Sequence, residues 1–184
     1  MFNVGDKVVY PMHGAGVIES IEEKSILDEK QSYYIIKMPG EVKVMVPTAK
    51  AEEIGVRNII DKASAQKVIE VLEQESTEMS MNWNKRYRDN MEKMKTGNIY
   101  EVADIVRNLS FKQKEKGLST GEKKMLLNAK QILVSELVLA EQKDLSEIES
   151  IVENKINASY ADHIAALEQN TVEENIVKKF IPLN

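Results

Sequence analysis

Residues 33–46 give the clearest fold signal in the first part of this chain; they read Tyr33-Tyr34-Ile35-Ile36-Lys37-Met38-Pro39-Gly40-Glu41-Val42-Lys43-Val44-Met45-Val46. Both of its arms are rich in β-branched and aromatic residues, and Pro39-Gly40 marks a turn between them, so the pattern predicts a β-hairpin. Two similar segments precede it, at residues 7–10 and 16–21. Four or five strands within about 55 residues, with no helical repeat between them, predict a small and strongly curved antiparallel sheet or barrel.

After Ile60 the apolar residues recur with a helical period. The pattern predicts a helix over residues 61–75, another that begins near Trp83, and a long helix over 119–143. An Asn, Ser or Thr three residues before a Glu is typical of a helix start, and Gly117 is typical of a helix end. The predicted starts are Asn98, Ser119, Ser146 and Thr171, the last opening a short final helix. We therefore predict an α+β chain, with a β-sheet domain over residues 1–60 and an all-α domain over 61–184.

Composition excludes several classes of function. The chain has no cysteine, which excludes disulfides, thiolate metal sites and cysteine nucleophiles and is compatible with the cytoplasm. It begins without the apolar run of a signal peptide, and Glu136 interrupts its most apolar later segment, so neither export nor a membrane span is expected. The two histidines, His13 and His163, lie in different halves, and no nucleophile or phosphate-binding motif is present. We expect no enzyme activity, no cofactor and no small-molecule substrate.

The charge is distributed unevenly. The whole chain has a formal net charge of −5, but residues 81–130 hold 12 Lys and Arg against 6 Asp and Glu, a net charge of +6. This basic region begins at Asn82-Trp83-Asn84-Lys85-Arg86-Tyr87, which contains the only tryptophan. A basic face beside a flat apolar ring favours contact with nucleic acid, although the acidic remainder should keep that contact weak unless something else holds the protein in place.

Three motifs together resemble the CarD/CdnL family of bacterial transcription regulators, over roughly residues 1–155. They are Val4-Gly5-Asp6-Lys7-Val8-Val9-Tyr10-Pro11-Met12-His13-Gly14-Ala15-Gly16, the tryptophan segment at residues 82–87, and Gly117-Leu118-Ser119-Thr120-Gly121-Glu122-Lys123-Lys124-Met125-Leu126. The first motif also resembles the polymerase-interacting module of transcription-repair coupling factors, so the second and third motifs distinguish CarD/CdnL.

The resemblance implies a Tudor-like β module that binds the β subunit of RNA polymerase. It also implies a helical module that contacts promoter DNA at the upstream edge of the melted bubble, where a tryptophan wedges into the minor groove and stabilises the open complex. Residues 161–184 form an extension on which the resemblance is silent. The matching DNA-contacting residues here are Trp83, Lys85, Arg86, Arg88, Lys123 and Lys124. On the polymerase side the matching residues are Lys24, Val44, Met45 and Val46, where Met45 replaces a frequent arginine and the backbone of Val44 and Val46 is expected to contribute.

The residues alone leave alternatives open. Trp83 also begins an apolar stripe with Tyr87, Met91 and Met94 at helical spacing, which is typical of a core residue. The core and wedge roles are compatible if the ring lies at the open end of that stripe. Val44 and Met45 fit an ordinary barrel strand as well as an exposed edge that adds a partner strand. Lys112, Lys114 and Lys116 fit a solvated helix end as well as a DNA contact. At the level of function, the alternative is a protein-only adaptor of the transcription machinery that buries Trp83 and touches no DNA.

Overall fold

The sheet comes first in the chain and the helices follow. The computed structural model describes residues 1–26 and 29–180, without the side chains of 26, 29 and 173–180. All strand pairs are antiparallel, in the order β4-β3-β2-β1-β5. The five strands are β1 (Lys7–Tyr10), β2 (Gly14–Ile26), β3 (Glu29–Lys37), β4 (Lys43–Pro47) and β5 (Arg57–Asn58).

Two short helical turns, η1 (Thr48–Lys50) and α1 (Ala51–Ile54), connect β4 to β5. The sheet bends at a β-bulge in β2, where the pairing with β3 shifts between Ile18 and Ser20. Its concave face holds a small core of its own. The buried residues of this core are Val8, Ile18, Tyr34, Ile36, Met38, Val46, Ala51 and Val56. The α+β prediction and the small, curved antiparallel sheet are confirmed.

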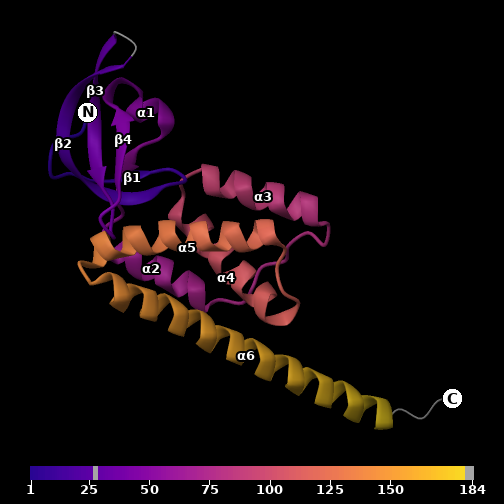
Figure 1. Cartoon of the computed structure of the whole chain (residues 1–184). Coiled ribbons are helices and arrows are strands. Elements are labelled where there is room, and N and C mark those ends of the chain that lie inside the picture. The colour runs from indigo at the N-terminus through magenta and orange to yellow at the C-terminus, as the bar shows by residue number, and fades with distance from the viewer. Residues whose placement is uncertain (27–28, 181–184) are drawn as a thin grey trace.

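The remaining helices are α2 (Lys62–Glu73), α3 (Trp83–Lys95), α4 (Ile99–Glu115), α5 (Thr120–Glu141) and α6 (Leu145–Phe180). They enclose a larger core, in which α4 and α5 supply most of the buried side chains. Figure 1 shows α5 running beneath the sheet, α3 beside it, and α6 along the lower side and out past the other helices. Within the described residues, none of these helices combines the length and apolar character that crossing a lipid bilayer requires.

The predicted helix starts are correct for α4 and α5 but wrong for α6. Asn98 caps α4 by accepting from the Tyr100 N–H, and Ser119 forms a reciprocal capping box with Glu122. The α6 helix already begins at Leu145, because the Ile148 N–H binds the Asp144 carbonyl, two residues earlier than a cap at Ser146 would allow. The predicted break at Thr171 is absent, since its hydroxyl donates to the Leu167 carbonyl inside a continuous helix.

Contacts from the start of the chain to α5 hold the sheet against the helices. The N–H of Ala15 donates to the Ser135 hydroxyl over 2.8 Å, and the Lys7 ammonium donates to the Leu139 carbonyl over 3.2 Å. Gly14 approaches α5 so closely that a Cβ there would lie 2.6 Å from the Ser135 hydroxyl oxygen. A side chain at residue 14 would therefore push the sheet away from α5.

Candidate functional site

Trp83 lies at the surface, at the first position of α3. Asn82 caps this helix by accepting from the Lys85 N–H over 3.0 Å. The indole is 43 % exposed, its Nε1 donates to the Ser119 hydroxyl over 2.7 Å, and its ring stacks on Tyr87 with centroids 5.8 Å apart. The interpretation of Trp83 as a buried core residue is therefore wrong. The predicted stripe does run inward from it, through the half-buried Tyr87 and Met91 to the buried Met94.

The start of α5 packs directly against the start of α3. Ser119 and Glu122 form the capping box that begins α5, and the same Ser119 hydroxyl receives the indole N–H. A Cβ added to Gly121 would lie 3.4 Å from the Tyr87 ring and 3.8 Å from the Trp83 ring. A methyl group at residue 121 would make ordinary van der Waals contact with both rings, so the two helix starts lie close together without requiring glycine there.

Arg86 joins these two helices internally instead of facing solvent. It is only 7 % exposed, and its Nε donates to the Glu122 carboxylate over 2.6 Å. Its Nη1 donates to the carbonyls of Ser80 and Met81, which lead into α3. Burial would raise the pKa of Glu122, but the Arg86 guanidinium and the Ser119 cap together hold that pKa below its usual range.

The expectation that Arg86 contacts phosphate is therefore corrected. Its guanidinium is already committed to a buried carboxylate and two carbonyls, and breaking that pair would leave Glu122 charged and unpaired. Sequence reasoning treats charged residues as exposed by default, and the partner of Arg86 lies 36 positions away. The local pattern therefore gave no signal for the pair.

The other four predicted DNA-contacting cations are exposed. They are Lys85, Arg88, Lys123 and Lys124, and among the described residues none of them takes part in an ion pair. The N-termini of α3 and α5 meet in the same place, and each adds partial positive charge. Figure 1 shows this end of the two helices on the side away from the sheet. We call Trp83, Tyr87 and these four cations the α3–α5 end. Its cations and helix N-termini suit the phosphates of a nucleic-acid backbone, and the indole offers a flat apolar surface beside them.

The lysines near the end of α4 differ from the cations of the α3–α5 end. The Lys114 ammonium donates to Asn157 over 2.7 Å and lies 5.6 Å from the centre of the Tyr160 ring, so it attaches α4 to α6. Lys116 caps the helix just before Gly117, whose φ of 76° is the left-handed conformation expected at a helix end. The interpretation of this run as a helix end thus fits the geometry.

On the sheet, β4 is an edge strand with an open side. The Met38 N–H donates to the Val42 carbonyl, so these opposed residues form a hydrogen-bonded pair. Hydrogen-bonded and non-bonded pairs alternate along an antiparallel ladder, so Val44 and Val46 point their backbone groups at β3. The backbone groups of Lys43 and Met45 point outward, and within the described chain nothing binds them. The outward backbone groups that a partner strand would need thus belong to Lys43 and Met45, not to Val44 and Val46.

Lys24 and Met45 share the convex face of the sheet. Lys24 of β2 lies opposite Gln31 of β3, and Met45 of β4 lies opposite Ile35, so the period of two places both side chains on one face. Met45 is 49 % exposed, and Lys24 pairs with Glu22 over 3.2 Å at the surface. Val46 is buried on the opposite face, and its side chain has no access to a partner.

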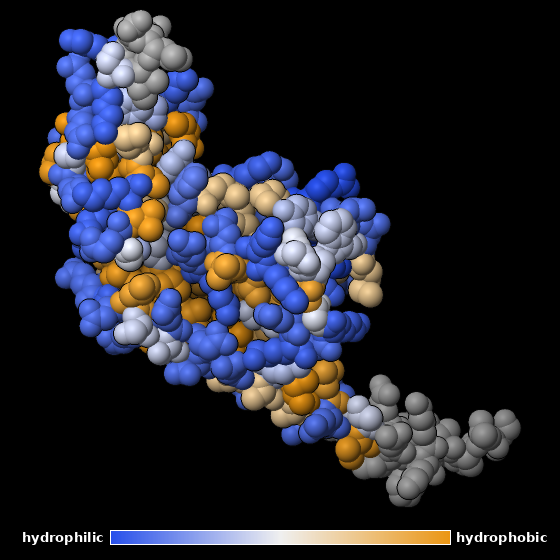
Figure 2. All heavy atoms as spheres, viewed as in Figure 1, coloured by the Kyte–Doolittle hydropathy of each residue, from blue (hydrophilic) through white to orange (hydrophobic). Residues whose placement is uncertain are grey.

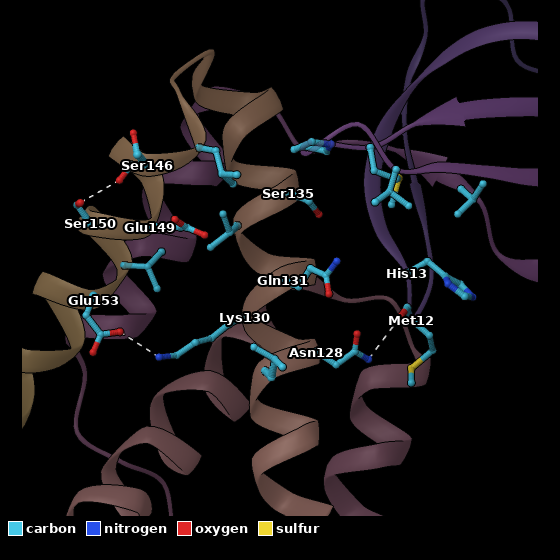
Figure 3. A pocket seen from close by; sticks show the side chains of 18 residues that line it. Met12, His13, Asn128, Lys130, Gln131, Ser135, Ser146, Glu149, Ser150 and Glu153 are labelled. Carbon is cyan, nitrogen blue, oxygen red and sulfur yellow. Dashed lines mark hydrogen bonds and ion pairs between the residues drawn. The ribbon is translucent and has the colours of Figure 1, made fainter.

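A groove of about 910 Å³ separates the β3–β4 turn from α5 and the start of α6. Figure 2 shows apolar side chains gathered in this area, and Figure 3 shows Asn128 reaching across from α5 to the carbonyl of Met12. Lys130 in its wall is paired with Glu153, and His13 stacks on Tyr10 with ring centroids 4.2 Å apart. Among the described residues, no cluster of three or more His, Asp or Glu side chains is arranged to hold a metal ion.

Comparisons with known proteins follow the same division of the chain. Residues 2–60 match the model of the CarD-like/TRCF RID domain, and residues 67–153 match the model of the CarD C-terminal domain. The chain is 45% identical over 138 residues to a Bacillus subtilis (strain 168) protein named "Putative transcription factor YdeB". The aligned region covers 74% of this chain and 90% of that relative. The sheet with its open β4 edge lies in the first matched region, and the α3–α5 end lies in the second. These matches show that the chain belongs to the CarD/CdnL family of transcription factors.

Proposed function

We propose that this protein binds the β subunit of RNA polymerase through the β4 edge and stabilises the open promoter complex through the α3–α5 end. The observation that carries the proposal is the half-exposed Trp83 ring, fixed by Ser119 and Tyr87 among four exposed cations and two helix N-termini. In this role the protein has no enzymatic activity, needs no cofactor or small-molecule substrate, and acts in the cytoplasm on the nucleoid, where the polymerase holds it.

The DNA part of the proposal follows from the chemistry of this end. Lys85, Arg88, Lys123 and Lys124 supply attraction to phosphate that depends on salt and is indifferent to base sequence. A rigidly held indole gains stacking and apolar contact beside an unstacked base step, and pyrimidine–purine steps open at low cost. The ring should therefore favour distorted DNA at the upstream edge of the bubble over intact duplex.

The polymerase part follows from the geometry of the sheet. An unpaired edge strand is a template for an added strand, with affinity from backbone hydrogen bonds and specificity from the side chains beside them. Lys43 and Met45 offer the outward backbone groups, and Lys24 lies on the same face as the Met45 side chain. A pairing that depends mainly on the backbone explains how methionine is tolerated where an arginine is frequent in the resembling family.

The test measures the lifetime of open promoter complexes formed with the full-length chain and RNA polymerase. Trp83→Ala should shorten that lifetime by roughly five- to a hundredfold, because stacking of one aromatic ring on a base is worth about 1 to 3 kcal/mol. Trp83→Phe should restore part of the lifetime, while binding to the polymerase β subunit stays unchanged. Tyr100→Ala, which removes an exposed aromatic ring from α4, is the matched control and should change nothing.

The protein-only adaptor predicts a different result. In that case Trp83→Ala leaves the lifetime unchanged, or lowers thermal stability and polymerase binding in parallel. Either outcome would remove the DNA contact from the proposal.

A further inference from the structure

Glu136 is a fully buried carboxylate in the middle of α5, 0 % exposed, within the apolar segment Ile132–Ala140. Its two oxygens accept from Arg57 Nη1 over 2.7 Å and Arg57 Nη2 over 2.9 Å, a bidentate pair. The Ile60 N–H donates to the same carboxylate over 3.0 Å. Among the described residues, the partners of this charge all lie outside α5, at the end of the sheet and in the segment that leads to α2.

Arg57 in turn joins three parts of the molecule. It belongs to β5, its Nη1 also donates to the neighbouring Asn58 carbonyl, and its Nε and Nη2 donate to the carbonyl of Gly97 over 3.2 and 2.8 Å. Gly97 lies in the turn between α3 and α4, directly after the helix that begins with Trp83. One planar guanidinium therefore fixes the sheet, the end of α3 and the middle of α5 relative to one another.

The pair adds direction to an interface that other contacts already hold together. Apolar contact is nondirectional, and each of the bonds from Ala15 to Ser135 and from Lys7 to Leu139 is a single link. A bidentate pair fixes both distance and angle. A buried ion pair is a weak source of net stability, because its desolvation cost offsets the attraction between the charges. Orientation is therefore the property that this pair contributes.

We propose that Arg57 and Glu136 are positioning residues that hold the sheet and the α3–α5 end at one fixed orientation, so that a protein bound to polymerase presents Trp83 to the DNA. The inference rests on the proposed function, because positioning matters only if the two ends engage their partners at the same time. It goes beyond that function by naming the residues that couple the two ends, neither of which touches DNA or the β4 edge.

The decisive variant is the double substitution Arg57→Met with Glu136→Leu. Apolar side chains of similar volume replace both charges, so the fold should persist. Its melting temperature should fall only by the loss of the bonds to the Ile60 N–H and the Gly97 carbonyl. Because the chain has no cysteine, Glu23→Cys on β2 and Asp89→Cys on α3 accept a pair of spin labels at two chosen exposed sites. The control is Lys130→Met with Glu153→Leu, which removes an ion pair between α5 and α6 that does not involve the sheet.

We expect the double variant to broaden the distribution of distances between the labels and to shorten the open-complex lifetime several-fold. Its separate affinities for the polymerase β subunit and for forked DNA should stay unchanged, and the control should match the unchanged protein in every measurement. A narrow, unaltered distance distribution would overturn the proposal, and so would a broadened one with an unaltered lifetime. Either of these two results would refute the positioning role of Arg57 and Glu136 but leave the proposed function intact. If the unchanged protein itself has no effect on the lifetime of open complexes, the proposed function is refuted, and the positioning role is refuted with it.

Discussion

The β4 edge and the α3–α5 end are both exposed, but the binding that we propose for them differs in kind. At β4 the unpaired groups belong to the backbone of Lys43 and Met45, so the side chains there are free to vary. At the α3–α5 end the groups proposed to bind are side chains, and the Arg86–Glu122 pair and the Ser119 cap hold them in place. A contact made by the backbone therefore tolerates substitution, whereas a contact made by side chains depends on the buried residues that hold those side chains.

The largest expected effect is a loss of unfolding free energy on substitution of Arg86, which supports the α3–α5 end. Arg86→Ala leaves the Glu122 carboxylate buried without its cation, which should cost about 3 to 5 kcal/mol of unfolding free energy. Urea denaturation of the full chain measures this cost. Arg88→Ala, two positions further along α3 and exposed, is the matched control and should stay within about 0.5 kcal/mol. Equal effects of the two substitutions would mean that Arg86 does not support the α3–α5 end.

A smaller effect is expected at the β4 edge, where Met45→Pro removes an outward N–H and leaves the bonds to β3 in place. Proline is tolerated on an edge strand when its nitrogen faces away from the sheet. Loss of one hydrogen bond to the partner, worth about 0.5 to 1.5 kcal/mol net, should weaken binding to the polymerase β subunit by roughly two- to tenfold. Isothermal titration with the β subunit measures this.

Met45→Ala serves as the control for the side chain at the same position. It keeps the N–H and should weaken binding to the β subunit less than Met45→Pro does. If alanine and proline weaken binding equally, the contact is made by the side chain and the backbone interpretation of β4 is wrong.

The smallest effect concerns Lys123 and Lys124, in the first turns of α5, where a cation opposes the helix dipole and gains nothing for folding. Replacing either residue with Glu should leave the unfolding free energy within about 0.5 kcal/mol. The slope of the logarithm of the DNA-binding constant against the logarithm of the salt concentration should decrease by the equivalent of about one phosphate contact for each substitution. Salt titration of binding to forked DNA measures this, and an unaltered slope for both variants would remove these lysines from the DNA face.

Much of the fold is predictable from local sequence because its signals are local. The alternation in Lys43–Val46 gives β4, and Ser119 with Glu122 gives the start of α5. Local signals also mislead: Ser146 and Thr171 resemble helix caps, yet α6 continues from Leu145 to Phe180. The Arg86–Glu122 pair was not predictable, because it joins residues far apart in sequence and the exposed cations nearby carry the same local pattern. Glu136 was visible only as an interruption of an apolar segment, and its partner Arg57 lies 79 positions away.

A site-specific crosslink shows where the α3–α5 end lies when the protein is bound to polymerase at a promoter. The chain has no cysteine, so Asn84→Cys, next to Trp83 and exposed, accepts a single photoreactive crosslinker. In open complexes with RNA polymerase we predict crosslinks to promoter DNA at one place, the upstream edge of the melted region. Crosslinks to polymerase alone, in complexes where the protein is demonstrably bound, would contradict the account.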